Sequence, residues 1–295
     1  MFYFNKNIQN IFIINGNSNT NKNKIKDFVN FLSTIPEEEQ IKNMVLYTVR
    51  RNDATILAKE YSDIYKDAVI YSVGGDGTLN EVVNGINLDS KLAIIPLGTG
   101  NDFYRVYKEI NGTQKIDLGV VNNKKFINIA SIGLDAEVAN KANYYKYKKK
   151  FRNFEYYAGI IDTLFKNPSY DTSLGNITLL AICNGKYYGN NIPINPNYNL
   201  NDGQFEVYKV SKLKRLEFLK LFLKIYQEEH FNNELVDHFK INNLKVTSEK
   251  NLICNVDGEI IYSNEFNFKI IKNAINLTND IPEYLKRYTL NIKNK

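Results

Sequence analysis

Several features that define common protein classes are scarce in this sequence of 295 residues. There are only two cysteines, Cys183 and Cys254, and both lie in apolar, strand-like runs. We therefore expect buried reduced thiols and neither a disulfide nor a cysteine metal site. There are also only two histidines, His230 and His238, which lie eight residues apart on polar ground, and we assign them no chemistry.

Long apolar runs are missing as well. No stretch approaches the roughly 20 apolar residues that a membrane-spanning helix needs, and the first ten residues lack the apolar core of a signal peptide. These absences predict a cytoplasmic protein. With 43% hydrophobic and 24% charged residues, the composition is that of a globular chain long enough for two domains. The net charge of +6 suits either an anionic nucleotide or an anionic membrane surface.

Two familiar phosphate-binding patterns are absent. The sequence contains no G-x-x-x-x-G-K-[S/T] and neither the His-Arg-Asp nor the Asp-Phe-Gly motif of protein kinases. Any phosphate site must therefore be built in another way.

A glycine-rich stretch, G-G-D-G-T-L-N-E-V-V-N-G at 74–85, follows the apolar run 68–73. After the glycines, Leu79, Val82, Val83 and Ile86 have helical spacing, so the glycines are predicted to form a strand-to-helix turn. Such a turn presents backbone N–H groups to an anion. Asp76 within it would face a phosphate group through a bridging Mg²⁺, although Gly-Gly-Asp-Gly on its own is equally typical of a plain tight turn.

A second turn of the same kind favours the phosphate interpretation. The apolar run 92–95 leads into P-L-G-T-G-N-D-F at 96–103, again with glycines and an acid, Asp102. Two such turns, one βα unit apart, are expected side by side at the carboxyl ends of parallel strands, where open α/β sheets bind ligands.

Together the two motifs resemble the catalytic domain of the diacylglycerol kinase family of lipid kinases, in its soluble bacterial form. The Gly-Gly-Asp-Gly motif also occurs in NAD kinases and phosphofructokinases, but Gly-Thr-Gly-Asn-Asp-Phe does not belong to them. The resemblance covers nearly the whole chain. It implies an α/β domain with a parallel sheet like that of NAD and diacylglycerol kinases, a β-rich sandwich domain after it, and an active site in the cleft between them.

The resemblance also implies roles for individual residues. Glu259, in the Asp-Gly-Glu at 257–259, would take the proton from a lipid hydroxyl, with Asp257 orienting it or joining the metal network. Asp76 and Asp102 would hold the Mg²⁺ of a magnesium–ATP complex. The remaining nucleotide contacts would come from Asn15, Thr48, Gly74, Gly75, Gly77, Thr78, Asn80, Glu81, Gly98, Thr99, Gly100 and Asn101.

A second, structural Mg²⁺ is implied at Asp202, together with the backbone carbonyls of Asn199 and Gln204. An Asp-Gly loop is a fair site for a hard cation, but an ordinary Asp-Gly turn explains the sequence as well. The chain departs from the family pattern at Gly16 and Asn19 in the first loop, and at Asn190.

The chain order predicts three segments. Strands and helices alternate through residues 1–112, including a helix that Asp53 is expected to cap, and form the nucleotide domain. Residues 113–278 form the β-rich lipid-substrate domain, starting with a hairpin of 116–121 and 125–132, and Asp135 is expected to cap the helix that follows. Residues 279–295 form a tail, helical at 283–290, that packs back on the first domain.

The implied partner is a lipid acceptor at the inner membrane surface, and no nucleic acid is expected. The stretch 141–152 carries six basic and four aromatic residues, which suits peripheral contact with anionic lipid, but a solvated helix face is the favoured interpretation. The apolar stripe at 212–226 is expected to pack in the core. The sequence leaves a homodimer open and does not distinguish diacylglycerol from other lipid alcohols.

Two rival functions remain. An NAD-kinase-like enzyme would phosphorylate a soluble nucleotide, and the second glycine motif argues against it. A catalytically silent regulator would bind nucleotide or lipid on the same fold, but such a protein has no use for the base Glu259.

Overall fold

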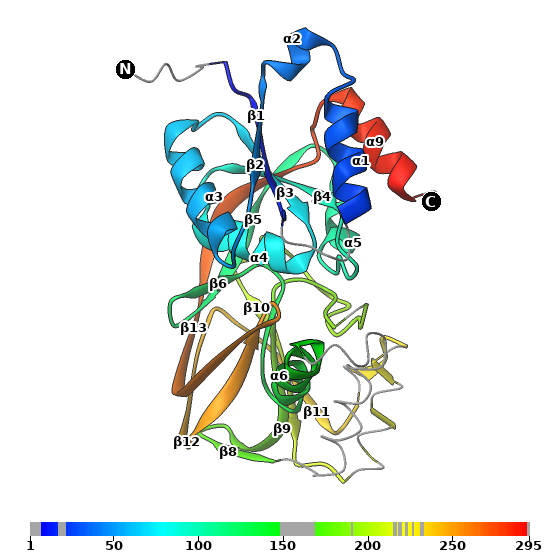
Figure 1. The fold of residues 1–295 in the computed structure, drawn as a ribbon. Helices are drawn as coiled ribbons and strands as arrows, with labels where there is room; N and C mark the ends of the chain where they lie inside the picture. The colour runs from blue at the N-terminus through cyan, green and yellow to red at the C-terminus, as the bar shows by residue number, and fades with distance from the viewer. Residues whose placement is uncertain are drawn as a thin grey trace. The chain divides into compact units, whose positions relative to one another are not determined.

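A computed structural model of the chain describes residues 7–16, 22–147, 169–189, 191–214, 217, 220–221, 224–225, 227–230 and 233–293, with the main chain alone at 141–147 and 292–293 (Figure 1). The chain divides into two compact units, which are described separately. Unit 1 comprises Met1–Ile116 and Asn273–Lys295, and unit 2 comprises Asp117–Lys272. The sequence placed its domain boundaries a few residues away, after residues 112 and 278.

Unit 1 contains a parallel sheet with the strand order β2, β1, β3, β4 and the end of β13. The strands are β1 (Asn10–Ile14), β2 (Asn43–Tyr47), β3 (Val69–Gly74), β4 (Lys91–Pro96) and β13 (Glu259–Thr278). The residues of β1 are all buried, and so are nearly all those of β3 and β4. This is why these strands read as continuous apolar runs, as strands covered on both faces do.

The helices of unit 1 lie between these strands in the chain, except for α9, which follows the last strand (Figure 1). They are α1 (Lys22–Leu32), α2 (Glu37–Gln40), α3 (Asp53–Ile64), α4 (Asp76–Gly85), α5 (Tyr104–Tyr107) and α9 (Glu283–Lys293). Helix α9 contains the helix expected at 283–290 and lies against α1, where the ring of Tyr288 stacks on Phe31 with centroids 4.7 Å apart.

The turn from strand β3 into helix α4 confirms the strand-to-helix prediction for the first glycine motif. The start of helix α3 differs in detail from the prediction. Asn52, in a left-handed conformation, is the cap residue, and Asp53 is the first helical residue. The Asp53 carboxylate instead accepts the N–H groups of Val49 and Arg50, both at 2.8 Å, and so fastens the preceding loop to the helix.

Unit 2 is built on antiparallel strands in the order β11, β10, β9, β7, β12, β13, with β8 beside β9 and with β5 beside β6 and β13. Their bounds are β5 (Thr113–Val121), β6 (Lys124–Phe126), β7 (Ile129–Gly133), β8 (Tyr170–Thr172), β9 (Gly175–Cys183), β10 (Phe205–Ser211), β11 (Val236–Ile241) and β12 (Asn243–Val256). One helix, α6 (Leu134–Tyr147), follows β7. Side chains alternate across the sheet: Leu180 and Ile182 join one apolar cluster, and Leu179 and Ala181 join another.

The predicted hairpin is present as β5 and β6, with Val121 opposite Lys124. Its second strand is shorter than expected, because the run at 125–132 breaks after Phe126 and resumes as β7. The break is stabilised by the carboxylate of Asp257, which accepts the N–H groups of Ile127 and Ile129. The side-chain contacts replace the missing strand ladder.

Three further expectations concern single residues or segments. Cys183 and Cys254 are free and buried, as predicted. His230 is not on polar ground but buried, and its ring lies against the carbonyl of Ile194. The stretch 141–152 lies outside the described side chains. Of the predicted helix at 212–226, residues 215–216, 218–219, 222–223 and 226 fall outside the described residues, and Leu213 of its apolar stripe is buried.

Candidate active site

The two glycine turns of unit 1 meet backbone to backbone. The N–H of Gly98 donates to the carbonyl of Gly74 at 2.9 Å. A Cβ atom on Gly98 would lie 2.2 Å from the Cα of Gly75, so no other residue fits at Gly98 without moving one of the turns. The second turn is held by Asn101, which has a left-handed conformation and donates from its side chain to the carbonyl of Gly98 at 2.9 Å. The prediction that the two turns lie side by side is therefore confirmed.

The two acids of these turns lie close together. Asp76 is the first residue of α4, and its carboxylate accepts the N–H of Phe103 at 3.4 Å. A Cβ on Gly100 would lie 2.9 Å from the other carboxylate oxygen, so the second turn covers Asp76 closely. Burial first, and then the negative charge of Asp102, raise the pKa of the Asp76 carboxyl, while N–H groups of the second turn oppose the rise.

This arrangement fits a magnesium–nucleotide. Two carboxylates, one from each glycine turn, offer the hard oxygen ligands that Mg²⁺ prefers. Across the described ranges, no three Asp, Glu, His or Cys side chains gather into a metal site, so phosphate oxygens and water would complete the coordination. Asn80 adds a further indication, because its amide nitrogen is buried without a hydrogen-bond partner among the described residues.

Other predicted nucleotide residues lie at the start of α4 and at the ends of β1 and β2. The amide of Asn15 donates to the hydroxyl of Thr78 at 3.2 Å. A Cβ on Gly16 would lie 2.6 Å from the carbonyl of Thr48, the residue after β2. The glycine at position 16, where the chain departs from the family pattern, therefore leaves room for the backbone of Thr48 to lie close by. Ser18 and Asn19 fall outside the described residues.

Glu81 has a clear structural contact besides any role at the nucleotide. Its carboxylate accepts the N–H of Ala54 at 3.2 Å, and its carbonyl accepts the hydroxyl of Thr55 at 2.9 Å. Both contacts join helix α4 to α3. Gly77, in contrast, has open space where a Cβ would be and is exposed, so it leaves the start of α4 accessible.

In unit 2, the Asp-Gly-Glu predicted to supply the base forms the tight turn between β12 and β13. Asp257 has a left-handed conformation, and its carboxylate accepts N–H groups from Ile127, Asn128 and Ile129. Asp257 therefore organises the backbone between β6 and β7. The carboxylate of Glu259 is paired with Lys124, whose ammonium nitrogen lies 2.8 Å from it, and the Glu259 side chain is 16% exposed.

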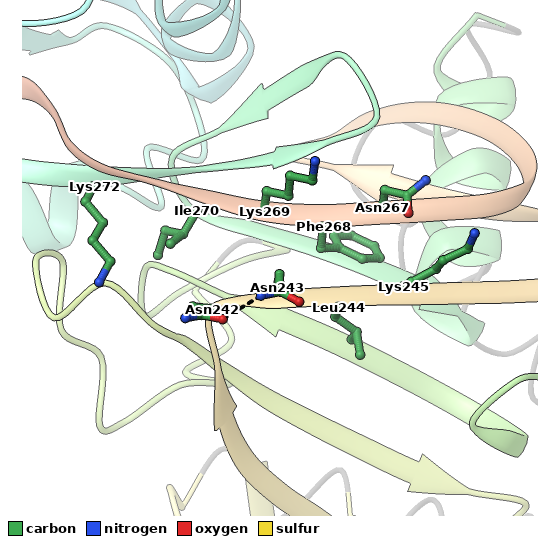
Figure 2. Close-up of a pocket in the computed structure, with 9 residues that line it drawn as sticks. All are labelled: Asn242, Asn243, Leu244, Lys245, Asn267, Phe268, Lys269, Ile270 and Lys272. Atoms are coloured by element: carbon green, nitrogen blue, oxygen red, sulfur yellow. Dashed lines mark hydrogen bonds between the residues drawn. The ribbon is translucent and has the colours of Figure 1, made fainter.

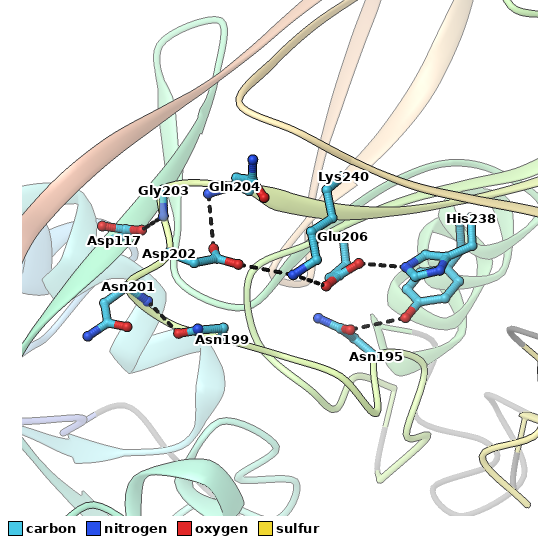
Figure 3. Close-up of polar contacts among 11 residues, drawn as sticks. Asp117, Asn195, Asn199, Asn201, Asp202, Gly203, Gln204, Glu206, His238 and Lys240 are labelled. Atoms are coloured by element: carbon cyan, nitrogen blue, oxygen red, sulfur yellow. Dashed lines mark hydrogen bonds and ion pairs between the residues drawn. The ribbon is translucent and has the colours of Figure 1, made fainter.

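In the Asp202 loop, also in unit 2, both oxygens of the carboxylate contact other groups of the protein (Figure 3). One oxygen accepts the N–H of Gln204 at 3.0 Å, and the other lies 3.2 Å from the ammonium nitrogen of Lys240. The side-chain oxygen of Asn199 accepts the N–H of Asn201 at 3.2 Å. These residues do not fit the Mg²⁺ that the resemblance implies here, because a positively charged side chain already contacts the only acidic ligand of the predicted set.

Sequence reasoning missed several polar residues of unit 2. Lys124, Glu206 and Lys240 form ion pairs across strands, for which no local pattern exists. Asp135 was expected to cap a helix, but it is buried in the first turn of α6 and accepts hydrogen bonds from Ser131 and Asn255. Burial raises the pKa of the Asp135 carboxyl.

A pocket of about 370 Å³ lies on strands β12 and β13 (Figure 2). Its walls include the apolar side chains of Leu244 and Phe268 and the charged side chains of Lys245, Lys269 and Lys272. None of the residues predicted for catalysis, nucleotide or metal binding lines this pocket, and we assign it no role in the reaction.

The fold and the paired turns define the class of the protein. A parallel α/β unit carries two abutting glycine turns with a pair of acids, and an antiparallel β unit accompanies it. This combination is that of a phosphate-transferring enzyme with neither a P-loop nor a protein-kinase fold.

Comparisons with known proteins identify the family. The model described as "Diacylglycerol kinase catalytic domain" matches residues 9–130, and that described as "YegS C-terminal NAD kinase beta sandwich-like domain" matches residues 128–279. A diacylglycerol kinase of Bacillus subtilis (strain 168) is 34% identical over 239 residues, which are 72% of this chain and 77% of that protein. For a diacylglycerol kinase of Staphylococcus haemolyticus (strain JCSC1435), identity is 30% over 257 residues, with 79% and 76% coverage.

A crystal structure of a diacylglycerol kinase from Bacillus anthracis str. Sterne shares the fold, with a TM-score of 0.65 at 20% identity, covering 92% of this chain and 96% of that one. The chain belongs to the diacylglycerol kinase family of lipid kinases, as the motifs predicted. The expected succession of an α/β domain and a β-sandwich domain is confirmed with it.

Proposed function

We propose that this lipid kinase transfers the γ-phosphoryl group of ATP to a lipid hydroxyl group, with Mg²⁺ as cofactor and diacylglycerol as the acceptor. The observation that supports this most directly is the contact between the two glycine turns, which brings Asp76 beside Asp102 at the start of α4. The acceptor is inferred from the relatives, which are named diacylglycerol kinases.

Phosphoryl transfer needs positioned phosphates, compensation of negative charge and removal of the acceptor's proton. The backbone N–H groups of the two turns would bind the phosphates, since glycine permits close approach and α4 presents its N-terminus to them. Asp76 and Asp102 would hold Mg²⁺, which neutralises charge on the phosphate oxygens when bound. Asn80 is a candidate donor to the nucleotide because its amide nitrogen lacks another partner among the described residues.

Glu259 is the proposed general base for the lipid hydroxyl. Its carboxylate is held by Lys124 at 2.8 Å and is only partly exposed, so it has a defined orientation. A carboxylate is a weak base for an alcohol, and its efficiency therefore depends on its placement as the proton leaves.

A lipid acceptor requires contact with a membrane surface. None of the helices in the described ranges has the length and hydrophobicity to span a bilayer. We propose that the enzyme acts from the cytoplasm as a peripheral protein at the inner membrane surface, helped by a net charge of +6 toward anionic lipids.

The test is transfer of labelled phosphate from ATP, with Mg²⁺, to a panel of lipids in mixed micelles, with NAD as a soluble acceptor. We expect phosphatidic acid as the labelled product. Labelled NADP would identify an NAD-kinase-like enzyme instead, and ATP binding without any labelled product would favour the regulator.

The base is tested with Glu259→Gln. This variant should lose at least 100-fold in turnover while it still binds nucleotide, because the general base contributes about 10²–10⁴-fold. The matched control is Glu265→Gln, an acid on the same strand that also pairs with a lysine, Lys245, at 3.0 Å. Turnover by Glu259→Gln at the level of this control would exclude Glu259 as the base.

A further inference from the structure

Lys240 occupies the position at the Asp202 loop where a bound cation would be expected. Its ammonium nitrogen lies 3.2 Å from Asp202 and 2.8 Å from Glu206, so one positive charge contacts two carboxylates (Figure 3). In the antiparallel pair of β10 and β11, Lys240 stands directly opposite Glu206. The register of the two strands therefore positions Lys240 beside Glu206.

Glu206 makes this positive charge necessary. Its carboxylate is 4% exposed, and a buried carboxylate is costly unless it is paired. His238 lies on the other oxygen, with its ring nitrogen 2.5 Å away. The hydrogen bond with Glu206 raises the pKa of Lys240, which keeps the ammonium group charged.

The loop is ordered by the protein itself. Asp117 is buried, and its carboxylate accepts the N–H of Gly203 at 2.7 Å, while its own N–H donates to the carbonyl of Leu200 at 2.6 Å. The N–H of Gln204 donates to Asp202. The contacts hold residues 199–204 from both sides without any added ligand.

We propose that Lys240 is the resident counter-ion of the Asp202 loop, and that this loop therefore binds no structural Mg²⁺. A divalent ion on Asp202 would have to displace the ammonium group of Lys240, or stand beside it against like-charge repulsion. Displacing the lysine would also leave His238 as the one basic side chain that the structure shows on Glu206. The magnesium requirement of the enzyme is then confined to the nucleotide site, so this inference complements the proposed function without depending on it.

The first test counts bound Mn²⁺, used as a paramagnetic probe, by electron paramagnetic resonance in nucleotide-free protein. The wild type and Asp202→Asn should bind the same number of ions, and Mg²⁺ or EDTA should shift their melting temperatures equally. One ion fewer in Asp202→Asn, with loss of a magnesium-dependent rise in melting temperature, would overturn the proposal. This measurement uses the wild-type fold and needs no activity, so it remains decisive if the proposed kinase reaction is wrong.

The second test removes the lysine. Lys240→Ala should lower the melting temperature by roughly 2–5 °C, because it takes a positive charge away from the buried carboxylate of Glu206, and the 45% exposure of the lysine side chain limits the effect. Lys240→Arg should retain most of the stability. The matched control is Lys209→Ala, which removes a lysine from the same pair of strands, where it contacts Asp237 at 2.8 Å. If Lys240→Ala were as stable as this control, Lys240 would not be the counter-ion.

Discussion

Asp76 in unit 1 and Asp202 in unit 2 both precede a glycine in a tight turn, yet their carboxylates have different neighbours. Asp76 faces backbone N–H groups and a second acid, Asp102, and its pKa is raised. Asp202 contacts the ammonium group of Lys240. In unit 2, the acids Glu206 and Glu259 are likewise paired with basic side chains.

The carboxylate of Asp76 is buried beside a second acid, whereas the carboxylate of Asp202 is already paired with a lysine. Two nearby acids, one of them with a raised pKa, favour the binding of a cation. The bound cation compensates for the desolvation of the buried carboxylate and for the repulsion between the two negative charges. A carboxylate already paired with a lysine gains little from a further cation. The same residue pair, Asp-Gly, thus suits a transient Mg²⁺ in unit 1 and a permanent internal counter-ion in unit 2.

The largest expected effect comes from removing the acid of unit 1. Asp76→Asn should lower phosphorylation of diacylglycerol in mixed micelles by at least 100-fold, the scale of a lost electrostatic contact at a transferring group. The protein should remain folded, since asparagine keeps the shape of the side chain. Asp89→Asn is the control, because Asp89 pairs with Lys115 on the surface of the same unit. If Asp76→Asn were as active as Asp89→Asn, Asp76 would have no special role in the reaction. The functional distinction between Asp76 in unit 1 and the lysine-paired acids of unit 2 would then be lost.

A smaller effect is expected from Lys124→Met, which leaves Glu259 without its ion-pair partner. We expect kcat to fall about tenfold with little change in the KM for ATP, because a misoriented base acts in the transfer step and not in nucleotide binding. Lys124→Arg should recover most of the loss. The control is Lys245→Met, which breaks the ion pair with Glu265 at 3.0 Å. A fall in thermal stability that accounts for all of the lost activity would reduce Lys124 to a structural role.

Three Asp-Gly pairs, at Asp76, Asp202 and Asp257, illustrate what the sequence could predict. All three were identified as functional acids on the strength of motifs. The structure gives each a different environment: the abutting glycine turns, the ammonium group of Lys240, and the backbone N–H groups of Ile127, Asn128 and Ile129 for Asp257. The local sequence pattern can locate an Asp-Gly turn. The groups that contact the aspartate carboxylate, however, come from segments many residues away in the sequence.

The fold of unit 1 was more predictable than the polar network of unit 2, for a physical reason. Fully buried parallel strands leave continuous apolar runs, and α4 leaves helical spacing, so β3, β4 and the two glycine turns could be located from local sequence. The ion pairs of Lys240 and Lys124 depend on cross-strand register. The register between strands follows from the packing of the whole sheet, so it cannot be predicted from the sequence of a single segment.

The smallest effect concerns stability and has a definite sign. Burial raises the pKa of Asp76, so the charged carboxylate is disfavoured in the folded state, and the resulting loss of stability is present above the folded pKa and absent below the unfolded one. Asp76→Asn should therefore raise the melting temperature at pH 8, in EDTA, by roughly 2–5 °C. The gain should shrink as the pH falls toward 4.

Asp53→Asn provides the opposite sign. Hydrogen bonds from the N–H groups of Val49 and Arg50 lower the pKa of Asp53, so its charged form stabilises the fold above the unfolded pKa and that contribution is lost as the pH falls. Asp53→Asn should lower the melting temperature at pH 8 and have less effect near pH 4. If both variants lowered the melting temperature at pH 8, Asp76 would be stabilised by its surroundings in the metal-free protein. The contrast with the lysine-paired acids of unit 2 would then fail.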